Sequence, residues 1–139
     1  LGRLLIRRNN FFARVLMPLL FGDRSKLSDH VHSHYLAALS TPDDRTGCWR
    51  LAREVTRSTD WLAGLWERSD RLAAKDVLLV WGMRDIAFRE RELDRWIERF
   101  PGAVVTRLGA GHYVQEEAPR SLIDAMEELF AGSPERSPS

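Results

Sequence analysis

The feature that most constrains the fold is a short, unbroken apolar run, Val77 to Trp81, which ends at Gly82. Such a run is typical of a strand that is buried on both faces, as in a parallel sheet. A second, weaker strand is predicted at 104–108. Apolar residues at helical spacing lie between the two strands: Leu93, Trp96, Ile97 and Phe100. This order predicts a βαβ unit with two parallel strands.

Each predicted strand is followed by a glycine-containing loop that carries one ionisable side chain, Asp85 after the first and His112 after the second. Parallel strands end at the same edge of a sheet, and ligands of open α/β sheets bind outside that edge. We therefore expect the two side chains to meet there. A carboxylate beside an imidazole fixes its tautomer and leaves the other nitrogen for a nucleophile or a water. Position alone favours the alternative, a turn aspartate and a packing histidine.

The first half of the chain predicts helices and no strand. Apolar residues recur at three- and four-residue steps through 4–20, and Pro18 is expected to kink or end that helix. Further helices are predicted at 27–39 and from Thr41, as the cap, with a proline next to it. A fourth helix is predicted after Ser58 or the threonine that follows it.

The chain is expected to divide near residue 70, into a helical region at 1–70 and a strand-containing region at 71–131. Residues 132–139 are rich in Ser, Pro and Gly and predict a disordered tail. Pro119 is expected to begin the last helix, with five apolar residues pointing inward: Leu122, Ile123, Met126, Leu129 and Phe130.

The charge composition limits the classes of binding partner that can be expected. The 139 residues carry 21 basic and 20 acidic side chains, a net charge of +1, which gives no reason to expect nucleic acid or a membrane surface as a partner. No transmembrane span is predicted, and no cofactor is expected. The one cysteine, Cys48, is expected to be a buried small residue, and a single cysteine suits a reducing compartment, so we expect a cytoplasmic location.

Two loop motifs resemble a known family. The segment VLLVWGMRD, 77–85, is very similar to the acid-bearing segment of haloalkane-dehalogenase-like α/β-hydrolases, and GAGHYVQEEAP, 109–119, resembles their histidine segment. LDRWIERFPGAVVTRL, 93–108, and HYLAALSTPDDRTGCW, 34–49, also resemble these proteins. The resemblance implies a partial α/β-hydrolase fold of class α/β, the C-terminal portion. Residues 1–69 would be most of a helical cap, followed by the last two parallel strands and helices of the main sheet.

By this resemblance His112 would be the catalytic base and Asp85 the acid that orients it. The nucleophile of the family precedes the cap on a sharp strand-to-helix turn, and no Gly-x-Ser-x-Gly or Gly-x-Asp-x-Gly pattern occurs in these residues. The expected partners are therefore a missing N-terminal half of the fold, a small apolar organic substrate and water. The chain alone is expected to be inactive.

Four functions stay open. A haloalkane dehalogenase would use an aspartate nucleophile, whereas a serine esterase or lipase would use the same Asp85–His112 pair to activate a serine. A β-lactone-processing relative would use similar parts. A non-catalytic remnant or binding module would need no nucleophile.

Four aromatic residues are candidates for an apolar substrate pocket: Phe11, Phe12, Trp61 and Phe88. Halide-binding N–H groups could come from the tryptophans and asparagines of the helical half: Trp49, Trp61, Trp66, Asn9 and Asn10. Core packing is the favoured alternative for each of them.

For two sets of ionisable side chains we favour a structural role over a functional one. His30, His32 and His34 invite a metal site, but without a matching motif we favour a solvated helix face and expect no metal. Glu116 and Glu117 are expected to act electrostatically at the N-terminus of the last helix.

Overall fold

A computed structural model describes residues 2–132, which form two compact units. The helical unit comprises residues 2–19 and 24–68, and the sheet unit comprises residues 20–23 and 69–132. The segment 20–23 therefore belongs to the sheet unit although both of its flanks belong to the helical unit. Among the helices of residues 2–132, none combines the length and apolar character that a membrane span requires.

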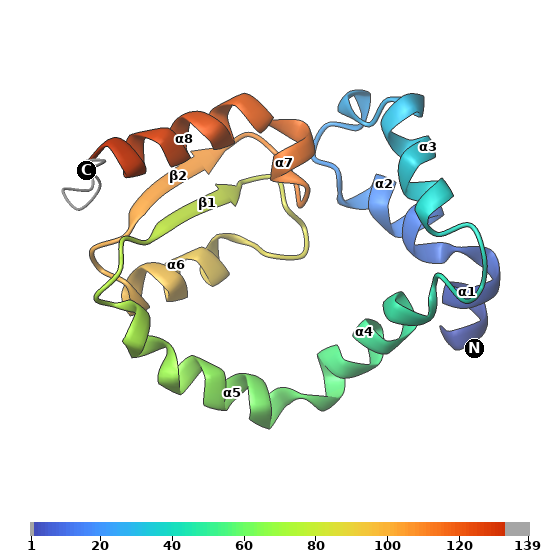
Figure 1. Ribbon diagram of the computed structural model, residues 1–139, viewed down its shortest axis with the longest axis horizontal. Helices are drawn as coiled ribbons and strands as arrows, with labels where there is room; N and C mark the ends of the chain where they lie inside the picture. Colours follow the sequence, from blue (N-terminus) through green and yellow to red (C-terminus); the bar gives the residue numbers. More distant parts are fainter. Residues whose placement is uncertain (1, 133–139) are drawn as a thin grey trace, which may run out of the picture. The chain divides into compact units, whose positions relative to one another are not determined.

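The sheet unit contains the two predicted strands, β1 (Leu78–Gly82) and β2 (Val104–Leu108), which pair in parallel (Figure 1). The register places Leu78 opposite Val104 and Gly82 opposite Leu108. Both strands therefore end at the same edge, and the parallel arrangement predicted from the sequence is confirmed.

Helices lie on both sides of this sheet (Figure 1). They are α6 (Glu90–Arg99) on one side and α8 (Pro119–Gly132) on the other. The short helices η3 (Arg68–Leu72) and α7 (Val114–Glu117) complete the helices of this part of the chain. The predicted apolar face of α6 packs inward, since Leu93 is fully buried and the Trp96 ring stacks on the buried Phe100 at 6.0 Å. Leu93 is thus the centre of the small core between α6 and the sheet.

Two packing predictions for the sheet unit are wrong. Residues 78–81 of β1 are half-buried instead of buried on both faces, and on α8 Ile123, Met126 and Phe130 are exposed while Ala125 is buried. Two strands offer too little sheet surface to cover two helices. The last helix also includes Gly132, which the sequence assigned to the tail, and residues 133–139 of that predicted tail lie outside the described residues.

The helical unit is built from short helices, as predicted. They are α1 (Gly2–Asn9), the π-helix η1 (Phe12–Leu16), α2 (Met17–Leu20), the 3₁₀ turn η2 (Arg24–Lys26), α3 (Asp29–Ala38), α4 (Thr46–Arg57) and α5 (Thr59–Glu67). Arg45 joins them, because its buried guanidinium donates to the carbonyls of Arg7, Arg8, Leu39 and Ser40.

The first helix breaks at Asn10 and not at Pro18. Asn10 has a positive φ of 49°, whereas Pro18 continues inside α2. Asparagine tolerates the left-handed region better than other residues with a Cβ. Its amide nitrogen donates to the carbonyl of Leu39 at 2.9 Å, and its side chain is 2% exposed. A tertiary hydrogen bond therefore fixes the break.

Substitution at Asn10 is expected to separate backbone strain from hydrogen bonding. Asn10→Gly and Asn10→Ala both remove the bond to Leu39, but only alanine is strained at this φ, so alanine should cost about 1 kcal/mol more stability than glycine. Urea denaturation of both variants measures the difference. Equal losses would show that the positive φ stores no strain.

The predicted start of a helix at Thr41 is wrong, because residues 41–45 form a turn and α4 begins at Thr46. The backbone N–H of Thr41 donates to Asp44 Oδ2 at 2.7 Å, and the N–H of Asp44 donates to Thr41 Oγ1 at 3.3 Å. These reciprocal bonds close the turn. Ser58 precedes α5, but its hydroxyl donates to Glu54 instead of capping that helix.

Acidification is expected to loosen the turn at 41–45. The backbone hydrogen bond from Thr41, followed by that residue's side-chain bond, lowers the pKa of Asp44 below its ordinary value of 3.8. A lowered folded-state pKa gives stability that is present above the ordinary value and is lost as the pH falls through the folded-state pKa. NMR titration of the Asp44 carboxyl measures that pKa, and Asp44→Asn should remove this part of the acid response. An ordinary pKa would contradict the expectation.

Candidate active site

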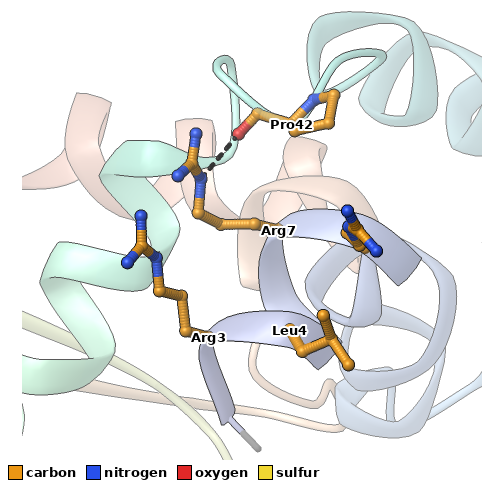
Figure 2. Close-up of a pocket in the computed structure, with 5 residues that line it drawn as sticks. Arg3, Leu4, Arg7 and Pro42 are labelled. Carbon is orange, nitrogen blue, oxygen red and sulfur yellow. Dashed lines mark hydrogen bonds between the residues drawn. The ribbon is translucent and has the colours of Figure 1, made fainter.

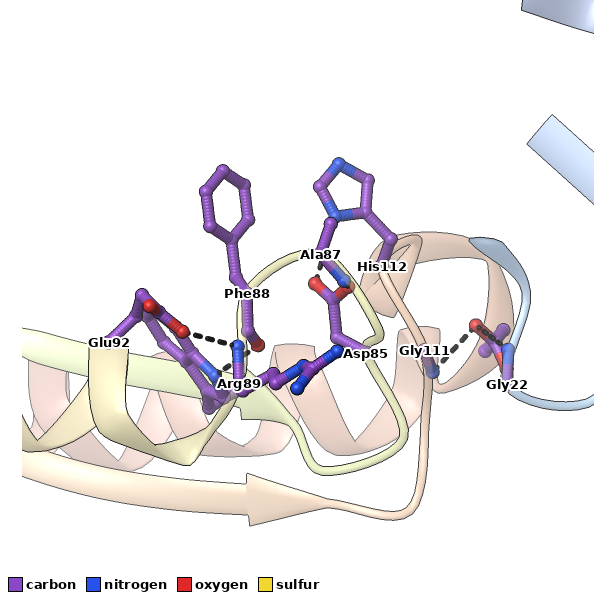
Figure 3. Close-up of polar contacts among 10 residues, drawn as sticks. Gly22, Asp85, Ala87, Phe88, Arg89, Glu92, Gly111 and His112 are labelled. Atoms are coloured by element: carbon purple, nitrogen blue, oxygen red, sulfur yellow. Dashed lines mark hydrogen bonds and ion pairs between the residues drawn. The ribbon is translucent and has the colours of Figure 1, made fainter. Parts of the chain in front are cut away.

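Asp85 and His112 meet at the edge where both strands end. Asp85 lies in the loop after β1 and His112 in the loop after β2, and His112 Nδ1 lies 2.8 Å from Asp85 Oδ2 (Figure 3). A carboxylate only accepts, so this contact requires a proton on Nδ1. The other ring nitrogen points away from Asp85 and has no hydrogen-bond partner in the described part of the chain. This geometry would let the imidazole act as a base that the carboxylate orients.

The carboxylate of Asp85 is held at both oxygens. Oδ1 accepts from the N–H of Ala87 at 2.7 Å while Oδ2 faces the imidazole. The Asp85 side chain is 7% exposed, and that of His112 is 30% exposed. The acid is therefore shielded from water, and the base stays accessible to a reacting molecule.

The two loops are joined through their backbones. The ladder continues past the strands, with Met83 N donating to Leu108 O at 2.8 Å and Arg84 N donating to Ala110 O at 2.9 Å. A Cβ on Gly82 would collide with the carbonyl oxygens of Ala110 and Gly111. Only glycine lets the loops approach this closely, and that approach sets the distance between acid and base.

A cavity of about 140 Å³ lies beside this pair and is lined by Val80, Trp81, Gly82, Asp85, Phe88, His112 and Val114. The Phe88 ring stacks on the imidazole at 5.3 Å between centroids, and Figure 3 shows the two rings side by side. The indole of Trp81 donates to the Phe88 carbonyl at 3.0 Å and holds that residue's backbone. Of the four aromatic residues predicted for a substrate pocket, Phe88 is the one in this cavity.

The other three predicted pocket residues belong to the helical unit: Phe11, Phe12 and Trp61. Phe11 and Trp61 are exposed and Phe12 is half-buried. The helical unit also holds the possible halide ligands, of which Trp49 and Trp66 are half-buried, Asn9 is exposed and Asn10 is buried. Core packing does not describe the exposed Trp61, and Cys48 is half-buried instead of buried.

Neither the short helix α7 nor the buried position of Glu117 was predicted from the sequence. Glu117 is 3% exposed and accepts hydrogen bonds from the N–H groups of Gly22, Asp23 and Gly111 at 3.1, 2.9 and 2.8 Å. The expectation of a helix-terminal electrostatic role is therefore wrong for this residue. Two partners lie 95 and 94 residues away in sequence, so no local pattern could have revealed them.

The helical unit has a cavity of its own, of about 610 Å³, lined by Arg3, Leu4, Arg7, Arg8 and Pro42 (Figure 2). Arg7 is already engaged there, since it donates to the Pro42 carbonyl at 3.1 Å and pairs with Asp43 at 2.6 Å. Arginine stays protonated at neutral pH and is not a general base. This cavity therefore lacks the chemistry that the Asp85–His112 pair offers.

The three histidines of α3 lie in two different environments. His30 and His34 are exposed with their Nε2 atoms 3.4 Å apart, and His32 Nε2 lies 2.8 Å from the Ala13 carbonyl. Within residues 2–132, no group of three or more His, Cys, Asp and Glu side chains is arranged to hold a metal ion.

Comparison with known proteins gives homologues but no matching family model. The chain is 34% identical over 128 residues to proteins named haloalkane dehalogenase 2 from Mycobacterium bovis and from Mycobacterium tuberculosis. The match covers 90% of this chain and 44% of each relative, so the chain spans less than half the length of these proteins. The resemblance predicted from the sequence is confirmed at this level: the chain is a partial homologue of proteins named haloalkane dehalogenase 2.

Proposed function

We propose that this chain supplies the base and the orienting acid of a haloalkane-dehalogenase-like hydrolase. The observation that carries the proposal is the 2.8 Å contact between His112 Nδ1 and Asp85 Oδ2 at the carboxyl edge of the sheet. Asp85 keeps the proton on Nδ1, and it stabilises the imidazolium that forms when Nε2 takes a second proton. Nε2 is thus the atom that acts on the substrate side.

The reaction needs a nucleophile from outside these 139 residues. In the proposed mechanism a carboxylate from that part attacks the carbon that bears the halogen, the carbon–halogen bond breaks, and halide leaves with the bonding electrons. His112 Nε2 then removes a proton from water, and the hydroxide attacks the carbonyl of the alkyl ester. The alcohol leaves, the carboxylate is restored, and His112 releases its proton to solvent.

The cavity beside His112 suits a small apolar substrate. Its volume, about 140 Å³, is below that of ordinary ligand pockets, roughly 300 Å³ and more, so further walls would complete it. Phe88 is the apolar wall that the sheet unit provides. We propose that the helical unit corresponds to the cap region of the intact hydrolase and that Phe11, Phe12 and Trp61 belong to the substrate pocket of that intact enzyme.

The test is to sequence the DNA upstream of the Leu1 codon and to assay the encoded protein for halide release from short haloalkanes. An in-frame elbow with aspartate, together with halide release, supports the proposal. A serine at the elbow, with ester hydrolysis and no halide release, favours the serine esterase. An open reading frame without an elbow would contradict the hydrolase and leave a binding module.

A β-lactone-processing enzyme is the alternative with the same base and acid. The Asp85–His112 geometry fits it equally well, because both chemistries need an activated imidazole next to an apolar cavity. Halide release distinguishes them, since a β-lactone contains no halogen.

A further inference from the structure

The segment 20–23 is attached to the loop that carries His112. The carbonyl of Leu20 accepts from the His112 backbone N–H at 2.9 Å, and the Phe21 ring stacks on Tyr113 at 5.1 Å between centroids. His112 is therefore held from its backbone side by residues about 90 positions earlier in the chain. Neither of these two contacts involves a residue of β1 or β2.

A single buried carboxylate fixes both segments. Glu117 Oε1 accepts from Gly22 N at 3.1 Å and from Gly111 N at 2.8 Å, and Oε2 accepts from Asp23 N at 2.9 Å (Figure 3 shows the bonds from Gly22 and Gly111). All three partners are donors, and an ionised carboxylate is the side chain that accepts at both oxygens and donates at neither. A buried carboxylate is tolerated only when it is bonded in this way.

The packing around the carboxylate leaves no spare room. A Cβ on Gly22 would lie 2.6 Å from Gly111 N, and a Cβ on Gly111 would lie 2.8 Å from Glu117 Oε1 and would also collide with the backbone of Gly22. Both positions must be glycine for the two segments to touch. Because these atoms are in close contact, a shift of Gly22 or Glu117 would also move Gly111, the residue before His112.

We propose that Glu117 is a positioning residue that keeps the His112 imidazole on Asp85 by tying the segment 20–23 to the histidine loop. The inference rests on the proposed function only where it concerns catalysis. What it predicts directly is the orientation of the His112 imidazole. A purely structural role would change stability and leave the Asp85–His112 contact intact. The two roles differ in what they predict for the tautomer of His112.

Hydrogen exchange of the unmodified 139-residue chain is the first test. The amide protons of Gly22, Asp23, Gly111 and His112 should be protected and should exchange with one shared opening rate, because one carboxylate and one backbone bond hold them together. Unprotected amides at these positions, or unrelated exchange rates, would overturn the proposal without any variant having to fold.

Glu117→Gln is the second test, and Glu127→Gln, the same change at an exposed position of α8, is the control. Glutamine keeps one acceptor oxygen and replaces the other by an NH2 group, which cannot accept from a backbone N–H. Either the Asp23 amide, which faces Oε2, or the Gly22 and Gly111 amides, which face Oε1, should therefore exchange roughly 10- to 100-fold faster. The ¹⁵N spectrum of the imidazole should change from the Nδ1-protonated tautomer to a mixture, with the β1–β2 amide signals retained. Glu127→Gln should leave both readouts unchanged.

The outcomes separate this proposal from the proposed function. Faster exchange with an unchanged His112 tautomer would show that Glu117 only stabilises the fold, and would overturn the positioning role. If Glu117→Gln also loses the β1–β2 signals, Glu117→Asp decides, because it keeps the carboxylate but shortens its reach. Restored strand signals with mixed tautomers support positioning, whereas a single tautomer while the Gly22 and Gly111 amides exchange fast refutes it. Halide release enters none of these readouts, so the absence of dehalogenase activity would refute the proposed function alone.

Discussion

A His112→Gln variant of the proposed dehalogenase is expected to release one equivalent of halide and then stop. Attack by a carboxylate nucleophile needs no base, whereas hydrolysis of the alkyl ester needs His112 Nε2 to activate water. Steady-state turnover should fall by about 10³-fold or more. Mass spectrometry of the quenched protein should show the added alkyl group, and a rapid-quench halide assay should show the single burst.

The matched control is His34→Gln, the same change at an exposed histidine of α3, which should keep full turnover. Continuous halide release by His112→Gln would contradict the assignment of His112 as the base. A serine hydrolase would behave differently, because its histidine is needed for the first step, so neither a burst nor a trapped intermediate would appear on an ester substrate.

Gly82→Ala is expected to cause a large loss of stability in the sheet unit. The added Cβ would collide with the carbonyl oxygens of Ala110 and Gly111. Both are backbone atoms, and the Ala110 oxygen is also held by the hydrogen bond from Arg84 N. Relief requires the two loops to separate, at a cost of about 3 kcal/mol or more. Urea denaturation followed by tryptophan fluorescence measures the loss.

Gly102→Ala is the control, since a Cβ there meets no atom within 4 Å and the glycine has no positive φ. That change should be neutral or slightly stabilising, because it restricts the unfolded chain. Equal stability of the Gly82 and Gly102 variants would show that the loops tolerate separation, and the close approach would then not set the Asp85–His112 distance.

The strands and the shared edge of Asp85 and His112 were predictable because the signals of the strands are local. Val77 to Trp81 is an apolar run ended by glycine, and parallel topology follows from the helix between the strands. Once the strands are parallel, the loops that follow them must share an edge. The contact between Asp85 and His112, 27 residues apart, is a consequence of that rule.

The errors of the sequence predictions in the helical half come from particular hydrogen bonds. Pro18 and Thr41 carry strong breaker and cap signals, but the chain breaks at Asn10 and turns at 41–45. In both places a particular hydrogen bond decides, from Asn10 to Leu39 and between Thr41 and Asp44. Tertiary and turn contacts of this kind outweigh propensities worth a fraction of a kcal/mol per residue.

The sequence by itself determined the strand–helix–strand order, the helical character of the first half, and the common edge of Asp85 and His112. Only the tertiary structure decided that Glu117 is buried and that the segment 20–23 supports the histidine loop. The physical reason is distance along the chain. Periodicity and turn chemistry act over a few residues, whereas the bonds from Gly22 and Asp23 to Glu117 span 95 and 94 residues and form only after the chain has folded.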